Sequence, residues 1–77
     1  MPQPPDQIVD LRGTPCPLNW VKAKLRLEEM RSGQRLEILL DNGDPILNVS
    51  RTIKSEGYRI VQAIPHDGYV QLLVEKT

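Results

Sequence analysis

The order of strand-like and helix-like segments is the feature that most constrains the fold of this chain of 77 residues. Strand-like segments occupy residues 8–12, 35–41, 58–64 and 69–75, and helix-like segments occupy residues 17–32 and 44–57. Strands separated by helices favour parallel pairs with right-handed crossovers, and the closing hairpin adds an antiparallel pair. The order βαβαββ therefore predicts an α/β (α+β) two-layer sandwich, with a four-stranded mixed sheet and both helices on one face.

The spacing of apolar residues indicates which side of each helix faces the sheet. In the first helix, one stripe with a 3.6-residue period consists of Trp20, Ala23, Leu27 and Met30. A second stripe on this helix, Leu18, Val21 and Leu25, points in another direction. We expect part of it to pack on the neighbouring helix or to stay exposed. Asp44 and Pro45 are typical of an N-cap followed by the first helical position, which predicts the start of the second helix.

Length and charge indicate a single domain with few classes of partner. Residues 1–6 are rich in proline and predict a disordered lead-in to one domain over residues 7–77. Ten Lys and Arg residues balance ten Asp and Glu residues, so we expect no direct binding of nucleic acid. There is no membrane-length apolar run and no basic-then-apolar signal at the amino end. We therefore expect a cytoplasmic monomer with no membrane contact.

The single cysteine, Cys16, excludes several kinds of site. One thiol cannot form a disulfide within the chain, and one thiol with one imidazole, His66, cannot form a zinc site. We expect no metal and no cofactor. His66 lies in the loop of the last hairpin and is expected to face solvent rather than to act as a base.

The position of Cys16 is unusual for a structural residue. We expect it at the N-cap of the first helix, with Pro17 at the first helical position, although N-caps favour side-chain oxygen over sulfur. Pro15 and Pro17 restrict the loop on both sides. Backbone N–H groups of Leu18, Asn19 and Trp20 are expected to point toward the sulfur. Such helix N-termini lower the pKa of a thiol from ~8.5 to ~3.5–7.5, so Cys16 is predicted to be a reactive thiolate.

Other groups near Cys16 in the sequence could assist the thiol or serve a partner. Arg12 and Gly13 end the first strand, and Arg12 either adds positive charge beside the sulfur or pairs with Asp10. Asn19 can add a side-chain N–H donor. The chain offers neither a general base nor an oxyanion pocket, so a cysteine hydrolase is disfavoured. An exposed thiolate without these groups can accept a sulfane sulfur as a persulfide and pass it on.

The residues around Cys16 carry a recognisable motif. The run Asp10-Leu11-Arg12-Gly13-Thr14-Pro15-Cys16-Pro17 resembles the D-x-R-G-x-x-C-P signature of the TusA/SirA-like sulfur-carrier family. The resemblance covers nearly all of the chain after the lead-in and implies the βαβαββ sandwich. It also implies that Cys16 is the sulfur-accepting residue of a sulfurtransferase, loaded by a donor such as a cysteine desulfurase. The sulfur would pass to an acceptor protein, toward tRNA thiolation or other sulfur trafficking. Asn19 stands where the family usually has a second proline.

Two other interpretations remain open at this point. One is a non-catalytic, redox-sensitive regulatory or protein-interaction module that docks through the stripe of Leu18, Val21 and Leu25. The other is RNA or ribosome binding, because the element order resembles that of the carboxyl-terminal domain of a bacterial translation initiation factor. The zero net charge argues against the second of these.

Overall fold

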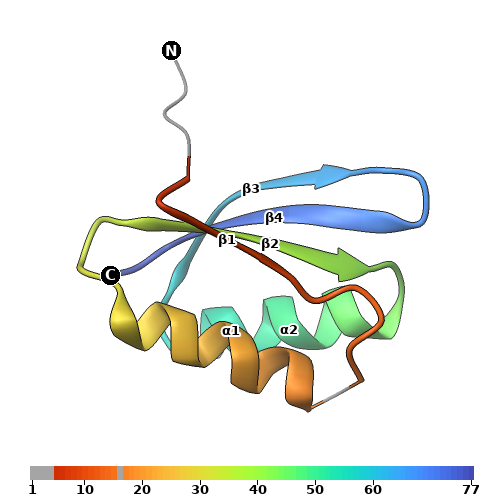
Figure 1. Ribbon diagram of the computed structural model, residues 1–77, viewed down its shortest axis with the longest axis horizontal. Helices are drawn as coiled ribbons and strands as arrows, with labels where there is room; N and C mark the ends of the chain where they lie inside the picture. Colours follow the sequence, from red (N-terminus) through yellow and green to blue (C-terminus); the bar gives the residue numbers. More distant parts are fainter. Residues whose placement is uncertain (1–4, 16) are drawn as a thin grey trace.

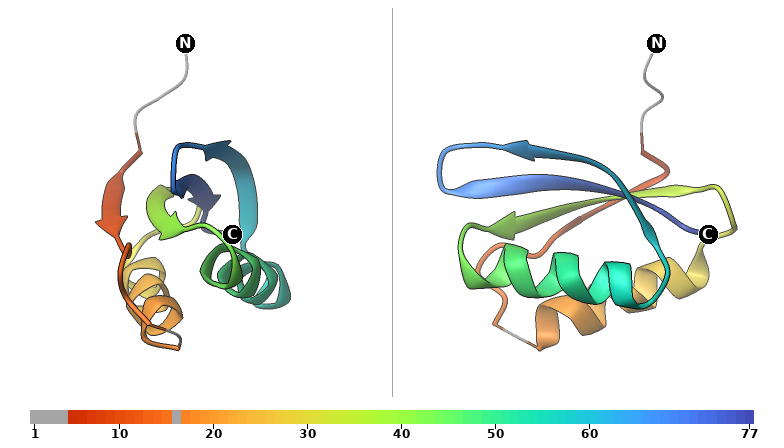
Figure 2. Two further views of the ribbon diagram at one scale, coloured as in Figure 1. Left: turned by 90° about the vertical axis from the view of Figure 1, so that its right-hand side faces the viewer. Right: turned by 180° about the vertical axis from the view of Figure 1, so that it is seen from behind.

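The computed structural model describes residues 5–15 and 17–77 and has the element order βαβαββ. Its strands are β1 (Gln7–Asp10), β2 (Arg35–Asp41), β3 (Arg59–Pro65) and β4 (Tyr69–Glu75), and its helices are α1 (Leu18–Glu29) and α2 (Asp44–Ser55). Both helices lie side by side on one face of a four-stranded sheet (Figures 1 and 2). The predicted two-layer sandwich is confirmed.

The strand order of the sheet is β1-β2-β4-β3. β1 pairs with β2 in parallel, and β4 pairs antiparallel with both β2 and β3. The strands before and after each helix were expected to be parallel neighbours. This is confirmed for β1 and β2, which α1 connects, and it is wrong for β2 and β3, which α2 connects. The last strand lies between β2 and β3, so the crossover through α2 skips one position in the sheet.

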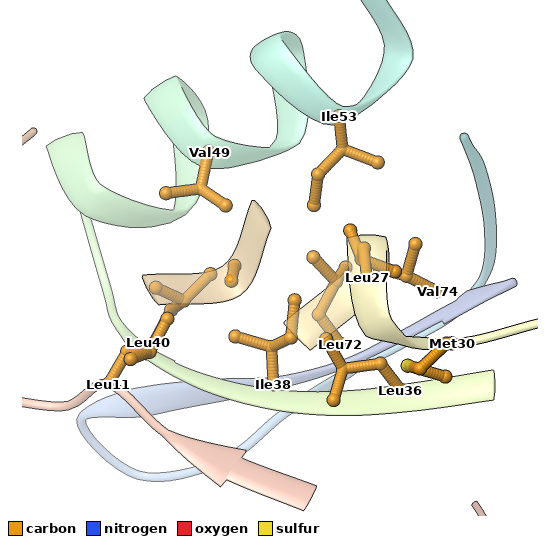
Figure 3. Packing of buried hydrophobic residues seen from close by; sticks show 11 residues of the cluster. Leu11, Leu27, Met30, Leu36, Ile38, Leu40, Val49, Ile53, Leu72 and Val74 are labelled. Atoms are coloured by element: carbon orange, nitrogen blue, oxygen red, sulfur yellow. The ribbon is translucent and has the colours of Figure 1, made fainter. Parts of the chain in front are cut away.

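The core fills the space between the helices and one face of the sheet (Figure 3). Alternate residues of β2 and β4 point toward the helices, as their strictly alternating burial shows. Ala23 and Leu27 of α1 and Val49 and Ile53 of α2 meet them from the other layer. The buried cluster consists of Leu11, Ala23, Leu27, Met30, Leu36, Ile38, Leu40, Val49, Ile53, Leu72 and Val74. The first apolar stripe of α1 is therefore the core-facing one, with Trp20 half-buried at its edge.

The helix ends differ from the predicted ones by one to three residues. α1 begins at Leu18 with Pro17 at the N-cap, so the expectation of Cys16 at the N-cap and Pro17 at the first helical position is wrong by one residue. The helix ends at Glu29 rather than at residue 32. The N-cap of α2 is Gly43, so Asp44 is already helical. Gly43 has φ +89°, a conformation that L side chains rarely adopt, which explains why glycine occupies the turn before α2.

The amino-terminal boundary of the folded domain also differs slightly from the predicted one. Residues 1–4 of the expected lead-in lie outside the described residues. The backbone N–H of Asp6 donates to Arg35 O at 2.9 Å, and the backbone N–H of Arg35 donates to Asp6 Oδ2 at 2.8 Å. Asp6 is therefore attached to the start of β2 and belongs to the folded domain.

Candidate functional site

The candidate site lies at the end of the molecule where both helices begin (Figure 1). The loop from Leu11 to Pro17 joins β1 to α1 and carries most of the predicted site residues, while Leu18 and Asn19 are the first two residues of α1. It begins at Leu11, which is buried and whose N–H donates to Leu39 O at 2.9 Å. Cys16 itself lies outside the described residues, so its surroundings are built from the residues on either side.

The first half of the loop is tied to the end of β2. Gly13 has φ +77°, and its N–H donates to Asp41 Oδ2 at 2.7 Å. The N–H of Thr14 donates to Leu11 O at 3.1 Å and closes a tight turn. Sequence reasoning missed Asp41, although parallel β1 and β2 necessarily end at the same edge of the sheet. A carboxylate at the end of β2 was the signal that could have identified it.

Arg12 is bound to Asp10, as one of the two sequence interpretations predicts. Its Nε donates to Asp10 Oδ1 at 3.0 Å and its Nη2 to Asp10 Oδ2 at 2.9 Å, which is a bidentate ion pair. The guanidinium also lies over the ring of Tyr69, 4.7 Å from the ring centre. The hydrogen bonds from Arg12 lower the pKa of Asp10 from 3.8 to about 2. These contacts fix Arg12 at the edge of the sheet, and its action on the thiol stays a prediction.

His66 is exposed at the tip of the last hairpin, as expected. Its ring stacks on Tyr69 with 4.7 Å between ring centres. Its Nε2 donates to Gln71 Oε1 at 2.9 Å. The Tyr69 ring thus contacts both His66 and the Arg12 guanidinium.

The second half of the loop leads into α1. The N–H of Asn19 donates to Pro15 O and the N–H of Val21 to Pro17 O, both at 3.1 Å, so these two prolines supply carbonyls to the first turn. The N–H of Trp20 donates to Asn19 Oδ1 at 2.7 Å. Each of these two N–H groups thus has an acceptor among the described residues. The expectation that the N–H groups of Leu18, Asn19 and Trp20 point toward the sulfur stays a prediction.

Asn19 is the one buried polar side chain among the described residues, with 1% of its surface exposed. Its Oδ1 stabilises the first turn of α1 from inside, through the bond to Trp20. Pro15, Pro17 and Leu18 are exposed around it. The side-chain amide of Asn19 therefore has a structural role, and a role as donor to the sulfur stays a prediction.

A hollow of about 320 Å³ opens beside the start of α1. It is lined by Pro17, Asn19, Trp20, Asn48, Val49, Arg51 and Thr52. Four of these residues come from α2, and sequence reasoning assigned Asn48 and Arg51 no role. Their spacing of three residues places them on one side of a helix. The sequence does not reveal that this side meets the start of α1.

The second apolar stripe of α1 stays exposed, which was one of the two expected outcomes. Leu18, Val21 and Leu25 are 52%, 45% and 57% exposed. Lys22, Lys24 and Arg26 alternate with them along the helix. The stripe therefore forms an apolar surface with basic residues at its sides.

Residues 5–15 and 17–77 contain neither a metal-binding cluster nor a membrane-spanning helix. No group of His, Asp and Glu side chains in this part of the chain could hold a metal ion. Neither helix there is long and apolar enough to cross a membrane.

Comparison with known proteins identifies the class and then the family. A SirA-like protein from Desulfitobacterium hafniense has the same two-layer fold, with a TM-score of 0.78 over 90% of this chain and 95% of that chain, at 24% sequence identity. The fold therefore defines a SirA-like α+β sandwich. Residues 7–76 match the family described as sulfurtransferase TusA. This chain belongs to that family.

Curated relatives agree with the family. A candidate sulfur carrier protein from Archaeoglobus fulgidus is 34% identical over 56 residues, which is 73% of this chain and 64% of that protein. The chain thus matches just under two thirds of the length of this relative. The sulfur carrier protein TusA from Allochromatium vinosum is 28% identical over 94% of this chain and 95% of its own length.

Proposed function

We propose that this protein carries sulfur as a persulfide on Cys16. The observation that carries the proposal is the match to the TusA family over residues 7–76, in which Cys16 is the only thiol. The names of the relatives from A. fulgidus and A. vinosum support the same role. The residues on both sides of Cys16 belong to a loop attached to β2 and to the first turn of α1.

The proposed chemistry conserves atoms and electrons. The Cys16 thiolate attacks the outer sulfur of a donor persulfide, R–S–SH. The S–S bond of the donor breaks, its inner sulfur leaves as a thiolate, and Cys16 becomes Cys–S–SH. An acceptor thiolate then removes the outer sulfur in the same way. The absence of a second cysteine in the sequence suits this role, because a neighbouring thiol would convert the persulfide to a disulfide.

We propose a cysteine desulfurase as the donor and a second protein as the acceptor, with tRNA thiolation as one destination of the sulfur. The pair of Arg12 with Asp10 and the bond from Gly13 to Asp41 support the idea that the loop is presented in one conformation. A loop held in this way needs less ordering when a partner binds.

The test is to incubate the protein with a cysteine desulfurase and cysteine and to measure its mass. We expect a gain of about 32 Da, the mass of one sulfur atom, on Cys16. Cys16→Ser should show no gain. The matched control is Cys16→Ser with Ser55→Cys, which moves the only thiol to the exposed end of α2. Equal loading of this control would mean that any exposed thiol reacts, which contradicts the proposal.

The exposed stripe of Leu18, Val21 and Leu25 is the observation that favours the alternative of a non-catalytic interaction module. In that case Cys16→Ser would retain the cellular function, whereas a sulfur carrier loses it completely. A complementation assay with Cys16→Ser separates the two functions.

A further inference from the structure

The hollow between the start of α1 and the middle of α2 lies directly beside the proposed sulfur-carrying position in the chain. Pro17, which is bonded to Cys16, forms part of its wall. The inference that follows rests on the proposed function, because it concerns what approaches the sulfur. The volume of about 320 Å³ is at the low end of the range that holds small ligands. It suits a short piece of peptide better than a large cofactor.

Among the described residues that line this hollow, Arg51 is the only charged one. Several other cations pair with side chains: Arg12 with Asp10, Lys24 with Glu28 and Arg35 with Glu75. Arg51 is exposed and makes no ion pair or side-chain hydrogen bond with the rest of the described chain. Its guanidinium is therefore available to a ligand, in a protein whose formal net charge is zero.

The remaining lining combines apolar surface with three polar side chains, those of Asn19, Asn48 and Thr52. Pro17, Trp20 and Val49 supply the apolar part. Asn48 is exposed on the same side of α2 as Arg51, and its side-chain amide offers both a donor and an acceptor for a peptide bond. Thr52 contributes less, because its hydroxyl already donates to Asn48 O at 2.8 Å.

We propose that this hollow binds a short acidic peptide segment of the sulfur donor, with a carboxylate next to the persulfide cysteine paired to Arg51. The planar guanidinium matches a carboxylate in a two-bond geometry, which a lysine could not offer. A cation at this position also offsets the repulsion between an anionic donor segment and the Cys16 thiolate. Arg51 is thus a positioning residue that selects acidic donors, and it takes no part in breaking or forming S–S bonds.

The experiment uses two short peptides with a central cysteine persulfide, flanked by glutamate in one and by glutamine in the other. The rate of Cys16 loading is followed by mass spectrometry with the full chain. At low salt we expect the glutamate peptide to react about three- to fivefold faster, as a partly exposed ion pair allows. This preference should disappear in about 1 M salt, where charges are screened within ~3 Å.

The variant Arg51→Gln should react with both peptides at the same rate. The control Arg59→Gln removes the same charge from an exposed position in β3, outside the hollow, and should keep the preference. If the wild type shows no preference, or Arg51→Gln retains it, the inference about Arg51 is overturned while the sulfur-carrier proposal stands. If neither peptide loads Cys16 in any variant, both proposals are overturned.

Discussion

Arg12 lies between two partners of different kinds, the carboxylate of Asp10 and the aromatic face of Tyr69. The first contact is local, since only one residue separates the two side chains, and the sequence suggested it. The second joins the loop after β1 to the start of β4, and only the folded sheet brings these together. A single guanidinium thus connects the signature loop to the closing hairpin.

The ion pair has a measurable effect on the titration of Asp10. The pKa of Asp10 is lowered to about 2 from its ordinary value of 3.8. A carboxylate with a lowered pKa stabilises the fold fully above its unfolded value, and this contribution is lost as the pH falls through the folded value. We expect the loss between about pH 4 and pH 2. Carboxyl NMR titration of the folded protein would measure the pKa directly.

Arg12→Gln supplies the comparison for this titration. Without the guanidinium, the pKa of Asp10 should return toward 3.8, and the difference in acid stability should vanish. Arg59→Gln, with the same loss of charge on β3, should leave the pKa of Asp10 near 2. An Asp10 pKa that is unchanged in Arg12→Gln would show that the pair does not form in solution.

Residues of the candidate site were predictable where they are close in sequence. The signature motif led to Arg12, Gly13 and the residues around Cys16. Asp41, Asn48, Arg51 and Tyr69 were not found, because their proximity depends on strand register and on the rotation of α2 against α1. Hydrophobic periodicity gives the inner face of each helix but not which outer residues meet another element.

Helix α1 has two apolar stripes, of which one is buried and the other is exposed. Leu27, on the inner stripe, is fully buried, whereas Leu25 on the outer stripe is 57% exposed. The two leucines are two residues apart, about half a turn of the helix, and carry the same side chain. Their contributions to the free energy of unfolding should therefore differ only because their packing differs.

This difference gives a matched pair of substitutions. Leu27→Ala removes core contacts and should lower the free energy of unfolding by about 2–5 kcal/mol. Leu25→Ala should change it by no more than about 0.5 kcal/mol, because no buried contact is lost. Urea unfolding of both variants measures the two values. Similar losses in the two variants would contradict the assignment of inner and outer faces.

The elements themselves were largely predictable from periodicity, and their ends less so. The strand β4 has the bounds expected for it, because its alternation runs without interruption. Expected helix ends relied on capping residues, and the caps turned out to be Pro17 and Gly43. Asp44 forms no side-chain cap, since the glycine before it already makes the turn with a positive φ.

Charge is balanced across the whole molecule. Ten cations and ten anions give a formal net charge of zero, and part of this balance consists of ion pairs on the surface. The exposed basic residues of α1 are accompanied by Glu28 and Glu29 at its end. Long-range attraction to polyanions should therefore be weak.

The prediction at this scale concerns RNA. We expect no binding of a labelled single-stranded RNA in fluorescence anisotropy, and no dependence of the signal on salt. A basic RNA-binding protein measured in parallel serves as the positive control. Binding that weakens steadily as salt is added would support the RNA-binding interpretation instead.

The overall architecture was predictable because six segments in the order βαβαββ leave few ways to cover one sheet with two helices. The position of β4 was not predictable. A crossover through α2 can place β3 next to β2, or it can leave room for one strand between them. The hydrophobic pattern favours the observed strand order only because it indicates that β4 is buried. β4 is strictly alternating and half-buried on its outer face, as suits a central strand.

The central position of β4 has a consequence for how the domain is made. β2 and β3 are not neighbours in the sheet, because β4 lies between them and pairs with both, while β2 pairs on its other side with β1. β4 is also the last of the four strands to leave the ribosome. Until it is synthesised, the nascent chain can form β1–β2 and its helices, but the middle of its sheet is missing. Folding of this domain therefore waits for its final strand.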